Sequence, residues 1–461
     1  MTFTAAGPGA LTGRVVRQGD ADYLDAKAGW NLLFAHDPAV VVFALETRDV
    51  VNALVWARQR EVPVRIRSGG HCLEGWSNVD GGIVIDVSQM KSVVIDPESD
   101  TATVGAGLDQ LEAVTALGEA GYLVPTGTEG TVGLVGATLG GGFGLLTRSF
   151  GMASDNLLAA EVVVPADHLG AQAITVDETN HVDLLWALRG AGNGNFGIVT
   201  SLTYRIHPLR ATVYVTASWA GLDGLAAVFE AWQGSAPFTD QRLTTQLEIG
   251  RDEIQMIGVL AGGSESEAAR LLSPILSVGH PDVSIAAGSW AETYAGFQIP
   301  TADEPANWKF FSQFISEPFP AEAIAVIGSF MAAAPTSGCN YFTNALGGAV
   351  VASEPVGGSV FAHRGALFYA EPGAGWGVRG GEPAAADPLT PVCEKWVADF
   401  ADALAPFVNG AYVNVPNAAM PEWGTAYWGA GLDRLRTIKA KYDPDDVFTF
   451  EQSVPSMHVQ P

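Results

Sequence analysis

The five residues Arg67-Ser68-Gly69-Gly70-His71 constrain this chain more than any other stretch. The preceding Val62 to Ile66 alternates apolar and other residues as a strand does, and Gly69-Gly70 permits backbone approaches that a side chain would forbid. Histidine is nucleophilic and largely uncharged near pH 7. The stretch therefore predicts a loop at the end of a strand that presents His71 to a cofactor. The alternative is a loop histidine that only hydrogen-bonds a carbonyl group.

A second glycine-rich run extends from Thr131 to Gly144, about sixty residues after His71. Such a density of glycine within a folded domain indicates backbone packed against a flat or anionic group, although a tight crossing of strands would also explain it. Neither GxxxxGK[ST] nor a GxGxxG between a strand and a helix is present. A bound pyrophosphate would therefore be held mainly by backbone N–H groups.

The charge balance narrows the classes of partner. With 50 acidic and 24 basic side chains, the formal net charge of -26 repels phosphate backbones and anionic lipids, so neither nucleic acid nor a membrane is expected as a partner. The longest Ala-rich run, Ile324 to Ala334, is too short to span a bilayer and predicts a buried helix. Met1 to Gly9 lacks the pattern of a secretory signal, which favours a cytoplasmic protein. The three scattered cysteines predict free thiols and no metal site.

The length of 461 residues predicts two or three domains, and the local patterns alternate between helices and strands. One helix is expected to run from Thr47, its candidate N-cap, and three others are expected over 108–120, 182–188 and 432–440. Expected strands cover 83–87, 161–164 and 198–206, and the segments 93–95 and 101–104 form a hairpin. This is an α+β pattern. After Pro208 the character changes, and a second domain is expected up to about Val415.

Taken together, these segments resemble the berberine-bridge-enzyme-like flavoproteins, a branch of the vanillyl-alcohol-oxidase superfamily. The resemblance rests on the His71 loop and on four further segments: Gly81 to Asp86, Thr131 to Gly144, Asp183 to Gly190 with Gly194 to Thr200, and Lys441 to Pro444 with Gln452-Ser453. It implies an FAD-binding domain of the PCMH type with two subdomains (1–208). It also implies a substrate domain with an antiparallel sheet covered by helices (209–415) and a C-terminal segment that returns to the first domain (416–461).

The resemblance also implies FAD bonded through its C8-methyl carbon to His71. Many relatives carry a cysteine that makes a second bond at the position of Glu129, so a single covalent link is expected here. Val132 lies three places later. In the family a small side chain at this position accompanies reaction of the flavin with O2, so an oxidase is expected. The residues expected to contact FAD are Arg67, Ser68, Gly69, Gly70, His71, Ser77, Thr131, Val132, Gly133, Gly136, Ala137, Gly141, Gly142, Gly144, Asn156, Gly197, Ile198 and Asn414.

The catalytic base is the open question. The family's Tyr-x-Asn-Tyr segment reads Tyr412-Val413-Asn414-Val415, so the usual second tyrosine is valine, and the family's frequent histidine before the triple glycine is Ala137. Tyr412, Glu371 and Tyr369 remain as candidate bases, with Tyr412 placed on the same strand face as Asn414.

Three functions are compatible with these residues. The first is an FAD-linked oxidase that oxidises an alcohol or amine carbon of a medium-sized small molecule, such as a biosynthetic intermediate, with O2 as acceptor. The second is an oxidative cyclase or oxygenase. The third is a redox-silent ligand-binding protein on the same fold.

Overall fold

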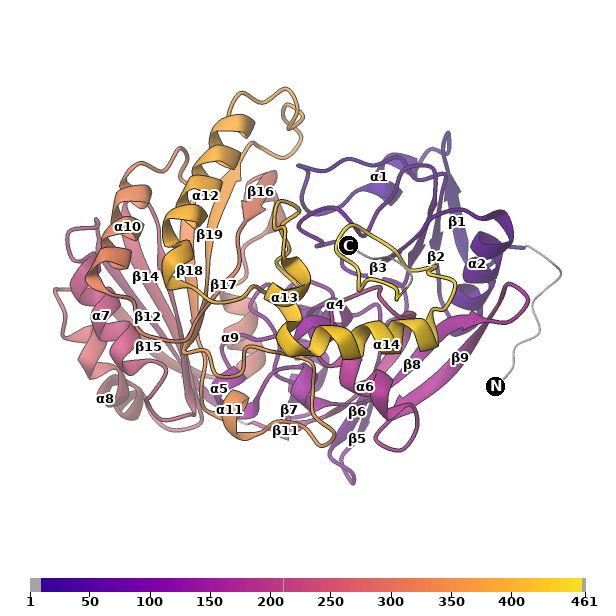
Figure 1. Cartoon of the computed structure of the whole chain (residues 1–461). Coiled ribbons are helices and arrows are strands. Elements are labelled where there is room, and N and C mark those ends of the chain that lie inside the picture. Colours follow the sequence, from indigo (N-terminus) through magenta and orange to yellow (C-terminus); the bar gives the residue numbers. More distant parts are fainter. Residues whose placement is uncertain (1–9, 210, 458–461) are drawn as a thin grey trace.

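Within the residues that the structure describes, four β-sheets are distributed over two parts that share a central cavity (Figure 1). The structure is a computed structural model that describes residues 10–209 and 211–457. Helices and mostly antiparallel strands alternate along it, so the α+β class expected from the sequence is confirmed. Within the described residues, no helix is both long enough and apolar enough to cross a membrane.

The first sheet carries the His71 loop. Its order is β1-β2-β4-β3, in which β2, β4 and β3 run parallel and β1 is antiparallel to β2. Helix α2 connects β2 to β3 and begins at Thr47 as expected, although Glu46 and not Thr47 is the N-cap and forms a capping box with Asp49. The bounds are β1 (Arg14–Arg17), β2 (Val40–Phe43), α2 (Thr47–Arg60), β3 (Val64–Arg67) and β4 (Ile83–Asp86).

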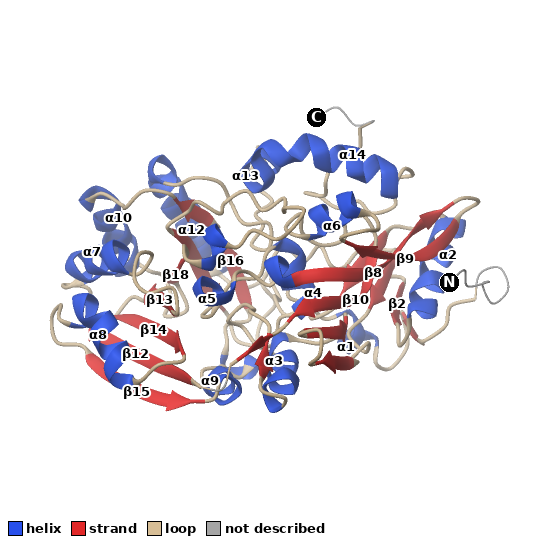
Figure 2. Cartoon of the chain, turned by 90° about the horizontal axis from the view of Figure 1, so that it is seen from below, coloured by secondary structure: helices blue, strands red, loops and turns tan. Residues whose placement is uncertain are grey.

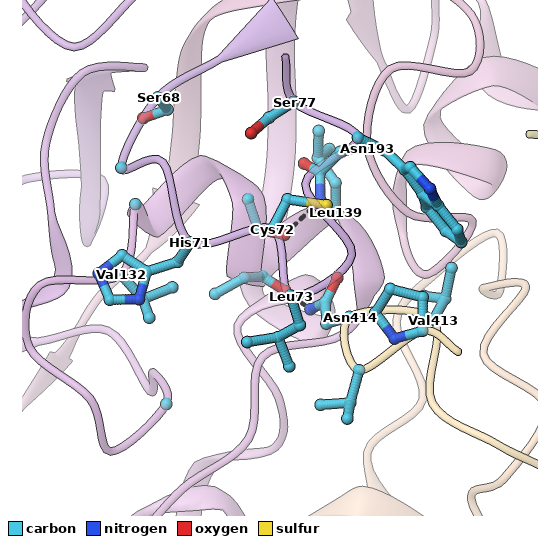
Figure 3. Close-up of a pocket in the computed structure, with 18 of the residues that line it drawn as sticks. Ser68, His71, Cys72, Leu73, Ser77, Val132, Leu139, Asn193, Val413 and Asn414 are labelled. Carbon is cyan, nitrogen blue, oxygen red and sulfur yellow. Dashed lines mark hydrogen bonds between the residues drawn. The ribbon is translucent and has the colours of Figure 1, made fainter. Parts of the chain in front are cut away.

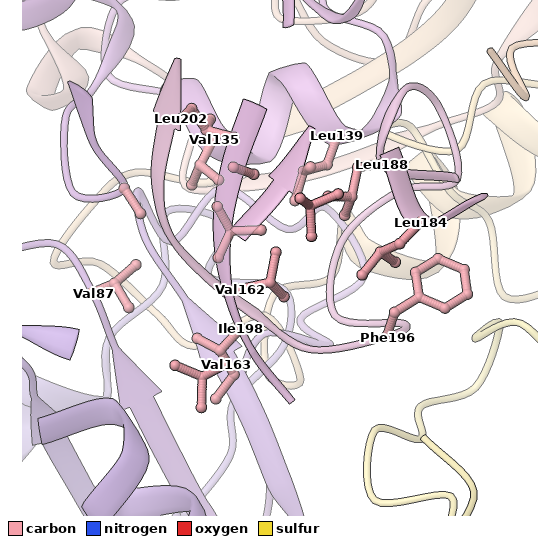
Figure 4. Close-up of a cluster of buried hydrophobic side chains, with 14 of the residues drawn as sticks. Val87, Val135, Leu139, Val162, Val163, Leu184, Leu188, Phe196, Ile198 and Leu202 are labelled. Atoms are coloured by element: carbon pink, nitrogen blue, oxygen red, sulfur yellow. The ribbon is translucent and has the colours of Figure 1, made fainter. Parts of the chain in front are cut away.

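The second sheet is antiparallel, in the order β5-β6-β10-β8-β9, and it includes the expected hairpin. Strand β8 is longer than the 161–164 expected, because its flanking alanines and Pro165 gave no strand signal. Val162, Ile198, Leu202 and Leu184 meet in its core (Figure 4). The bounds are β5 (Val93–Asp96), β6 (Thr101–Gly105), α3 (Gln110–Glu119), α4 (Leu134–Gly140), β8 (Leu157–Ala166), β9 (Gly170–Asp177), α6 (Val182–Leu188) and β10 (Ile198–Arg205).

The largest sheet has eight antiparallel strands in the order β15-β12-β14-β13-β18-β19-β16, with β17 also paired to β19. Helices α7, α8, α10 and α12 cover one face (Figures 1 and 2). The strands are β12 (Thr212–Ala220), β13 (Leu243–Ile249), β14 (Glu253–Ala261), β15 (Asp282–Gly288), β16 (Asn307–Phe310), β17 (Gln313–Ile315), β18 (Asn340–Ala345) and β19 (Phe368–Trp376). The helices are α7 (Leu225–Ser235), α8 (Glu265–Leu276), α10 (Ala321–Ala332) and α12 (Thr390–Leu404).

The stretch expected as a buried helix is α10, and only one side of it is buried. Ile324, Ile327 and Met331 pack into the core, whereas Glu322 and Ser329 lie at its exposed surface. The apolar spacing of a surface helix explains this arrangement.

The end of the chain returns to the first part. Helix α14 (Leu432–Tyr442) lies beside α6, where the Tyr442 hydroxyl donates to Asp183 at 2.8 Å. Buried Lys439 donates to Asp443 and to the carbonyl groups of Asn195 and Phe448. These contacts agree with a returning C-terminal segment, and the domain limits 1–208, 209–415 and 416–461 stay a prediction.

Candidate functional site

A cavity of about 490 Å³ is lined by residues from both parts of the molecule. One wall is formed by the loop after β3, the segment that leads into α4, and residues near Gly194. The opposite wall comes from β13, β16, β18 and β19, and the segment Tyr412–Val415 lies between the walls. Figure 3 shows His71, Val132 and Asn414 around this space. The two glycine-rich segments singled out in the sequence therefore meet at one site.

The His71 ring is held on two sides. Its plane stacks on Trp30, with ring centroids 4.8 Å apart, and its Nε2 lies 2.9 Å from the Thr131 hydroxyl oxygen. Trp30 is itself fixed by a hydrogen bond from its indole nitrogen to Glu304 at 2.8 Å. Burial, together with the nearby Arg379 cation, lowers the pKa of His71 to about 3. The imidazole is consequently neutral across the physiological pH range.

The glycines of the two loops are required by backbone contact. A Cβ atom on Gly69 would collide with the backbone nitrogen of Gly133, and one on Gly133 would lie 2.7 Å from the Gly69 nitrogen. The loops therefore pack main chain against main chain, which only glycine allows. This packing brings the His71 loop against the start of α4.

Arg67 holds the base of the loop. Its Nε donates to Asp86 at 2.5 Å, and its Nη1 donates to the Ala28 carbonyl at 3.4 Å. Both members of the ion pair are buried. The guanidinium is thus engaged with protein groups, so we assign Arg67 to positioning of the loop, although it also lines the cavity.

Tyr369 and Glu371 lie on the cavity face of β19, while Ala370 between them packs into the core on the helix-covered side. The Tyr369 hydroxyl donates to the Glu371 carboxylate. Burial raises the pKa of Glu371 to about 7, an effect that the hydrogen bond from Tyr369 opposes and the charge of Glu248 reinforces. Burial and the adjacent carboxylate raise the pKa of Tyr369 well above its ordinary value.

The segment around Tyr412 is a turn, with the Val415 N–H bonded to the Tyr412 carbonyl at 2.9 Å, so the expected strand at this point was wrong. The two side chains still meet, because Asn414 Nδ2 donates to the Tyr412 hydroxyl oxygen at 2.9 Å. The Gly142 N–H donates to the same oxygen at 2.9 Å. Burial raises the pKa of Tyr412 to about 12, although both donors act in the opposite direction.

Most of the residues expected to contact the cofactor line the cavity: Arg67, Ser68, Gly69, Gly70, His71, Ser77, Val132, Gly133, Gly136, Ala137, Gly142, Gly197 and Asn414. Thr131, Gly141, Gly144, Asn156 and Ile198 lie outside the lining. Asn156 is engaged with the backbone of Phe150 and Met152 and with His207, and Ile198 belongs to the core. Thr131 contacts the site through His71.

The structure adds lining residues that the sequence motifs did not indicate. Trp30 and Trp308 stack with centroids 6.2 Å apart, and Gln246 and Asn344 form a hydrogen bond of 2.7 Å on the cavity face of the large sheet. Side chains alternate between the two faces of a strand, and this alternation along β13 and β18 was the available signal that Gln246 and Asn344 share one face. Nothing in the sequence marks the loop residue Trp30.

Comparison with known proteins adds two family matches. Residues 38–169 match the family model of an FAD binding domain, and residues 411–455 match the model described as berberine and berberine like. The first match contains the His71 loop and the Thr131 to Gly144 run, and the second contains Tyr412 and α14.

Similar proteins align with this chain over nearly its whole length. Two FAD-linked oxidoreductases of Bacillus subtilis, YgaK and YvdP, are 36% and 40% identical. The alignments cover 97% and 96% of this chain, and 98% of each relative. Among solved structures, the berberine-bridge-enzyme-like protein 1 of Physcomitrella patens superposes with a TM-score of 0.88 over 97% of both chains at 24% identity. An aclacinomycin oxidoreductase superposes with a TM-score of 0.86 over 96% of this chain and 99% of its own, also at 24% identity. These superpositions confirm the expected fold.

Proposed function

Because the chain belongs to the berberine-bridge-enzyme-like family of FAD-linked oxidoreductases, we propose that it oxidises an alcohol or amine carbon of a medium-sized organic molecule, with O2 as the electron acceptor. The observation that carries the proposal is the placement of His71 and Glu371 on the lining of one cavity. One residue would hold the cofactor there, and the other would take a proton from the substrate.

The described residues fit FAD. The cavity wall is rich in main-chain groups at Gly69, Gly70 and Gly133, which suits an anionic pyrophosphate in a protein of net charge -26. The Asn414 side-chain oxygen is a buried acceptor without a partner among the described residues, so it is free to accept from a cofactor N–H. When bound, FAD would supply the acceptor for a hydride from the substrate carbon and would pass the two electrons to O2.

His71 would hold the cofactor covalently, and it would do so alone. A neutral imidazole is the nucleophilic form, and the low pKa of His71 keeps it in that form. Glu129 stands at the position where many relatives have a second linking cysteine. Its carboxylate already accepts hydrogen bonds from the Thr131 backbone and hydroxyl.

Glu371 is the candidate base that the electrostatics favour. A general base works best when its pKa lies near the working pH, and the pKa of about 7 places Glu371 in that range. Tyr412 fits the role less well, because a phenol with a pKa of about 12 is protonated at neutral pH. We therefore assign proton removal to Glu371 and orientation of its carboxylate to Tyr369.

The substrate wall is mixed in character. Phe143, Phe310 and Phe342 contribute apolar surface, while Gln246 and Asn344 contribute amides, and the Gln246 side-chain oxygen has no partner among the described residues. Such a lining suits a molecule with a flat apolar body and at least one hydroxyl or amine group. Since Glu371 supplies a base, the valine at position 415 does not require the alternative of oxidative cyclisation or oxygenation.

An anaerobic flavin-bleaching screen against alcohols, sugars and amines tests the proposal, with hydrogen peroxide measured after O2 is admitted. We expect at least one class to bleach the flavin and to yield one equivalent of peroxide per turnover. Failure of every class to bleach it would favour a redox-silent binding protein. Bleaching without peroxide on reoxidation would contradict the assignment of O2 as acceptor.

A further inference from the structure

Glu129, Thr131 and His71 form a continuous chain of hydrogen bonds beside the cavity. The Thr131 hydroxyl donates to the Glu129 carboxylate at 2.8 Å, and the Thr131 backbone N–H donates to the same oxygen at 3.1 Å. The Thr131 hydroxyl oxygen lies 2.9 Å from His71 Nε2. His71 lines the cavity, whereas Thr131 is exposed to solvent. This chain of hydrogen bonds therefore runs from the half-buried His71 at the cavity to the protein surface.

Counting donors and acceptors along this chain of hydrogen bonds assigns one tautomer to His71. A threonine hydroxyl has one hydrogen, and an ionised carboxylate only accepts. Because Thr131 gives its hydrogen to Glu129, its oxygen must accept from His71, so Nε2 carries the imidazole proton. The lone pair of the neutral ring is then at Nδ1. The neighbouring group that a histidine contacts commonly sets its tautomer in this way.

We propose that Glu129 and Thr131 are positioning residues for attachment of the flavin: they hold His71 with its proton at Nε2, direct Nδ1 toward the cofactor, and accept the Nε2 proton when the bond forms. The proposal rests on the covalent link suggested above. It gives the glutamate at position 129 a role in making the single bond.

The step balances as follows. Nδ1 of His71 forms a bond to the carbon of the flavin 8-methyl group, and one C–H bond of that group breaks, with its proton released to solvent. The two electrons left on the flavin reduce O2 to hydrogen peroxide. Alkylation at Nδ1 would leave the ring positively charged, so the Nε2 proton passes through the Thr131 hydroxyl to Glu129. The half-buried Glu129 then exchanges it with water.

Three substitutions test the members of this hydrogen-bond chain one at a time. Thr131→Val removes the hydroxyl with little change of shape at an exposed position, Thr131→Ser keeps the hydroxyl, and Glu129→Gln keeps an acceptor for Thr131 but removes the charge that receives the proton. The full-length chain is produced without flavin in a riboflavin-starved host. It is then mixed with FAD in air, and the covalently linked fraction is followed by intact mass. Non-covalent FAD binding is measured separately by fluorescence quenching.

We expect Thr131→Val to slow linkage on the order of 10²-fold while binding FAD normally, the lower end of what a general base contributes. Thr131→Ser should restore nearly the wild-type rate of linkage. The linkage rate of Glu129→Gln should lie between the rates of Thr131→Val and Thr131→Ser. In ¹⁵N spectra of the flavin-free protein, His71 should appear as the Nε2–H tautomer, and Thr131→Val should shift it toward a mixture.

Two outcomes contradict the proposal in different ways. Linkage by Thr131→Val at the wild-type rate, or an Nδ1–H tautomer in the wild type, would overturn the relay while leaving the covalent bond standing. Flavin that stays unlinked in the wild type would overturn the covalent bond and the relay together.

Discussion

The Tyr369 hydroxyl donates a hydrogen bond to the Glu371 carboxylate, and the two residues lie on the same face of strand β19. The phenol stabilises the ionised carboxylate, but burial outweighs it and leaves the pKa of Glu371 at about 7. A carboxylate that is half ionised at neutral pH, inside a cavity and with a fixed orientation, has the properties expected of a general base.

Replacement of Glu371 by Gln should slow anaerobic flavin reduction by roughly 10²- to 10⁴-fold, because the base is lost while the shape of the side chain is kept. Flavin content should not change. Stopped-flow absorbance of the flavin measures the rate. Glu322→Gln, at the exposed start of α10, is the matched control and should react as the wild type does. A loss of less than about tenfold in Glu371→Gln would move the base elsewhere.

The rate of flavin reduction should rise with pH and level off above an apparent pKa of about 7. Below that value Glu371 is protonated and accepts no proton, and above it the carboxylate is available. The limiting reduction rate with a saturating substrate, measured across this range, gives the profile. In Glu371→Gln the same profile should be flat, and an unchanged inflection in that variant would assign the titration to another group.

Tyr412→Phe should reduce the rate of flavin reduction only a few-fold. The phenol is protonated at neutral pH, and its oxygen already accepts from Gly142 and Asn414. The sequence alone made Tyr412 a leading candidate for the base, so this variant discriminates between the two assignments. A loss on the order of 10²-fold with normal flavin content would restore Tyr412 to that role.

The intact mass of the protein should exceed the mass of the chain by one FAD, and the flavin should remain with the protein after acid precipitation. The reason is the single bond that we propose at His71, since Glu129 supplies no second linking thiol. His71→Ala should release the flavin into the acid supernatant. Flavin that is extracted from the wild type would show that the site binds its cofactor without a bond.

Val132→Leu should slow reoxidation of the reduced enzyme by O2. Val132 lines the cavity, and a larger side chain there would narrow the space through which O2 reaches the cofactor. Rapid mixing of the reduced protein with O2 provides the comparison, and Val351→Leu, at an exposed position outside the cavity lining, is the control. If Val132→Leu is reoxidised as fast as the wild type, position 132 does not govern access.

The parts of the fold that could be predicted are those with strong local patterns. The periodic helix α2, helix α6 and the β5–β6 hairpin all form where their apolar spacing and turn residues indicate. The strand expected at Tyr412 failed because Asn414 and Pro416 favour a turn that short-range alternation conceals.

The site was predictable on one wall only. Glycines such as Gly69 and Gly133 are conspicuous in a sequence, because the backbone contact between them excludes every other residue. Gln246 and Asn344 are ordinary polar residues in strands, and they become part of a site only when two distant strands pair. Trp30 acquires its place from contacts with residues 41 to 278 positions away, which no local pattern encodes.

Along β13, β18 and β19, side chains alternate between the cavity and the helix-covered core, so the residues that would contact a substrate differ from the residues that stabilise the sheet. Gln246, Asn344 and Glu371 face the cavity, whereas their neighbours Leu247, Ala345 and Ala370 pack beneath the helices. Every second position on these strands is therefore open to substitution without disturbing the helix-covered core. The loops that would hold FAD come from other segments of the chain and would stay intact. Such a protein can diverge toward new substrates through single-residue changes on one sheet face while it inherits its cofactor chemistry unaltered.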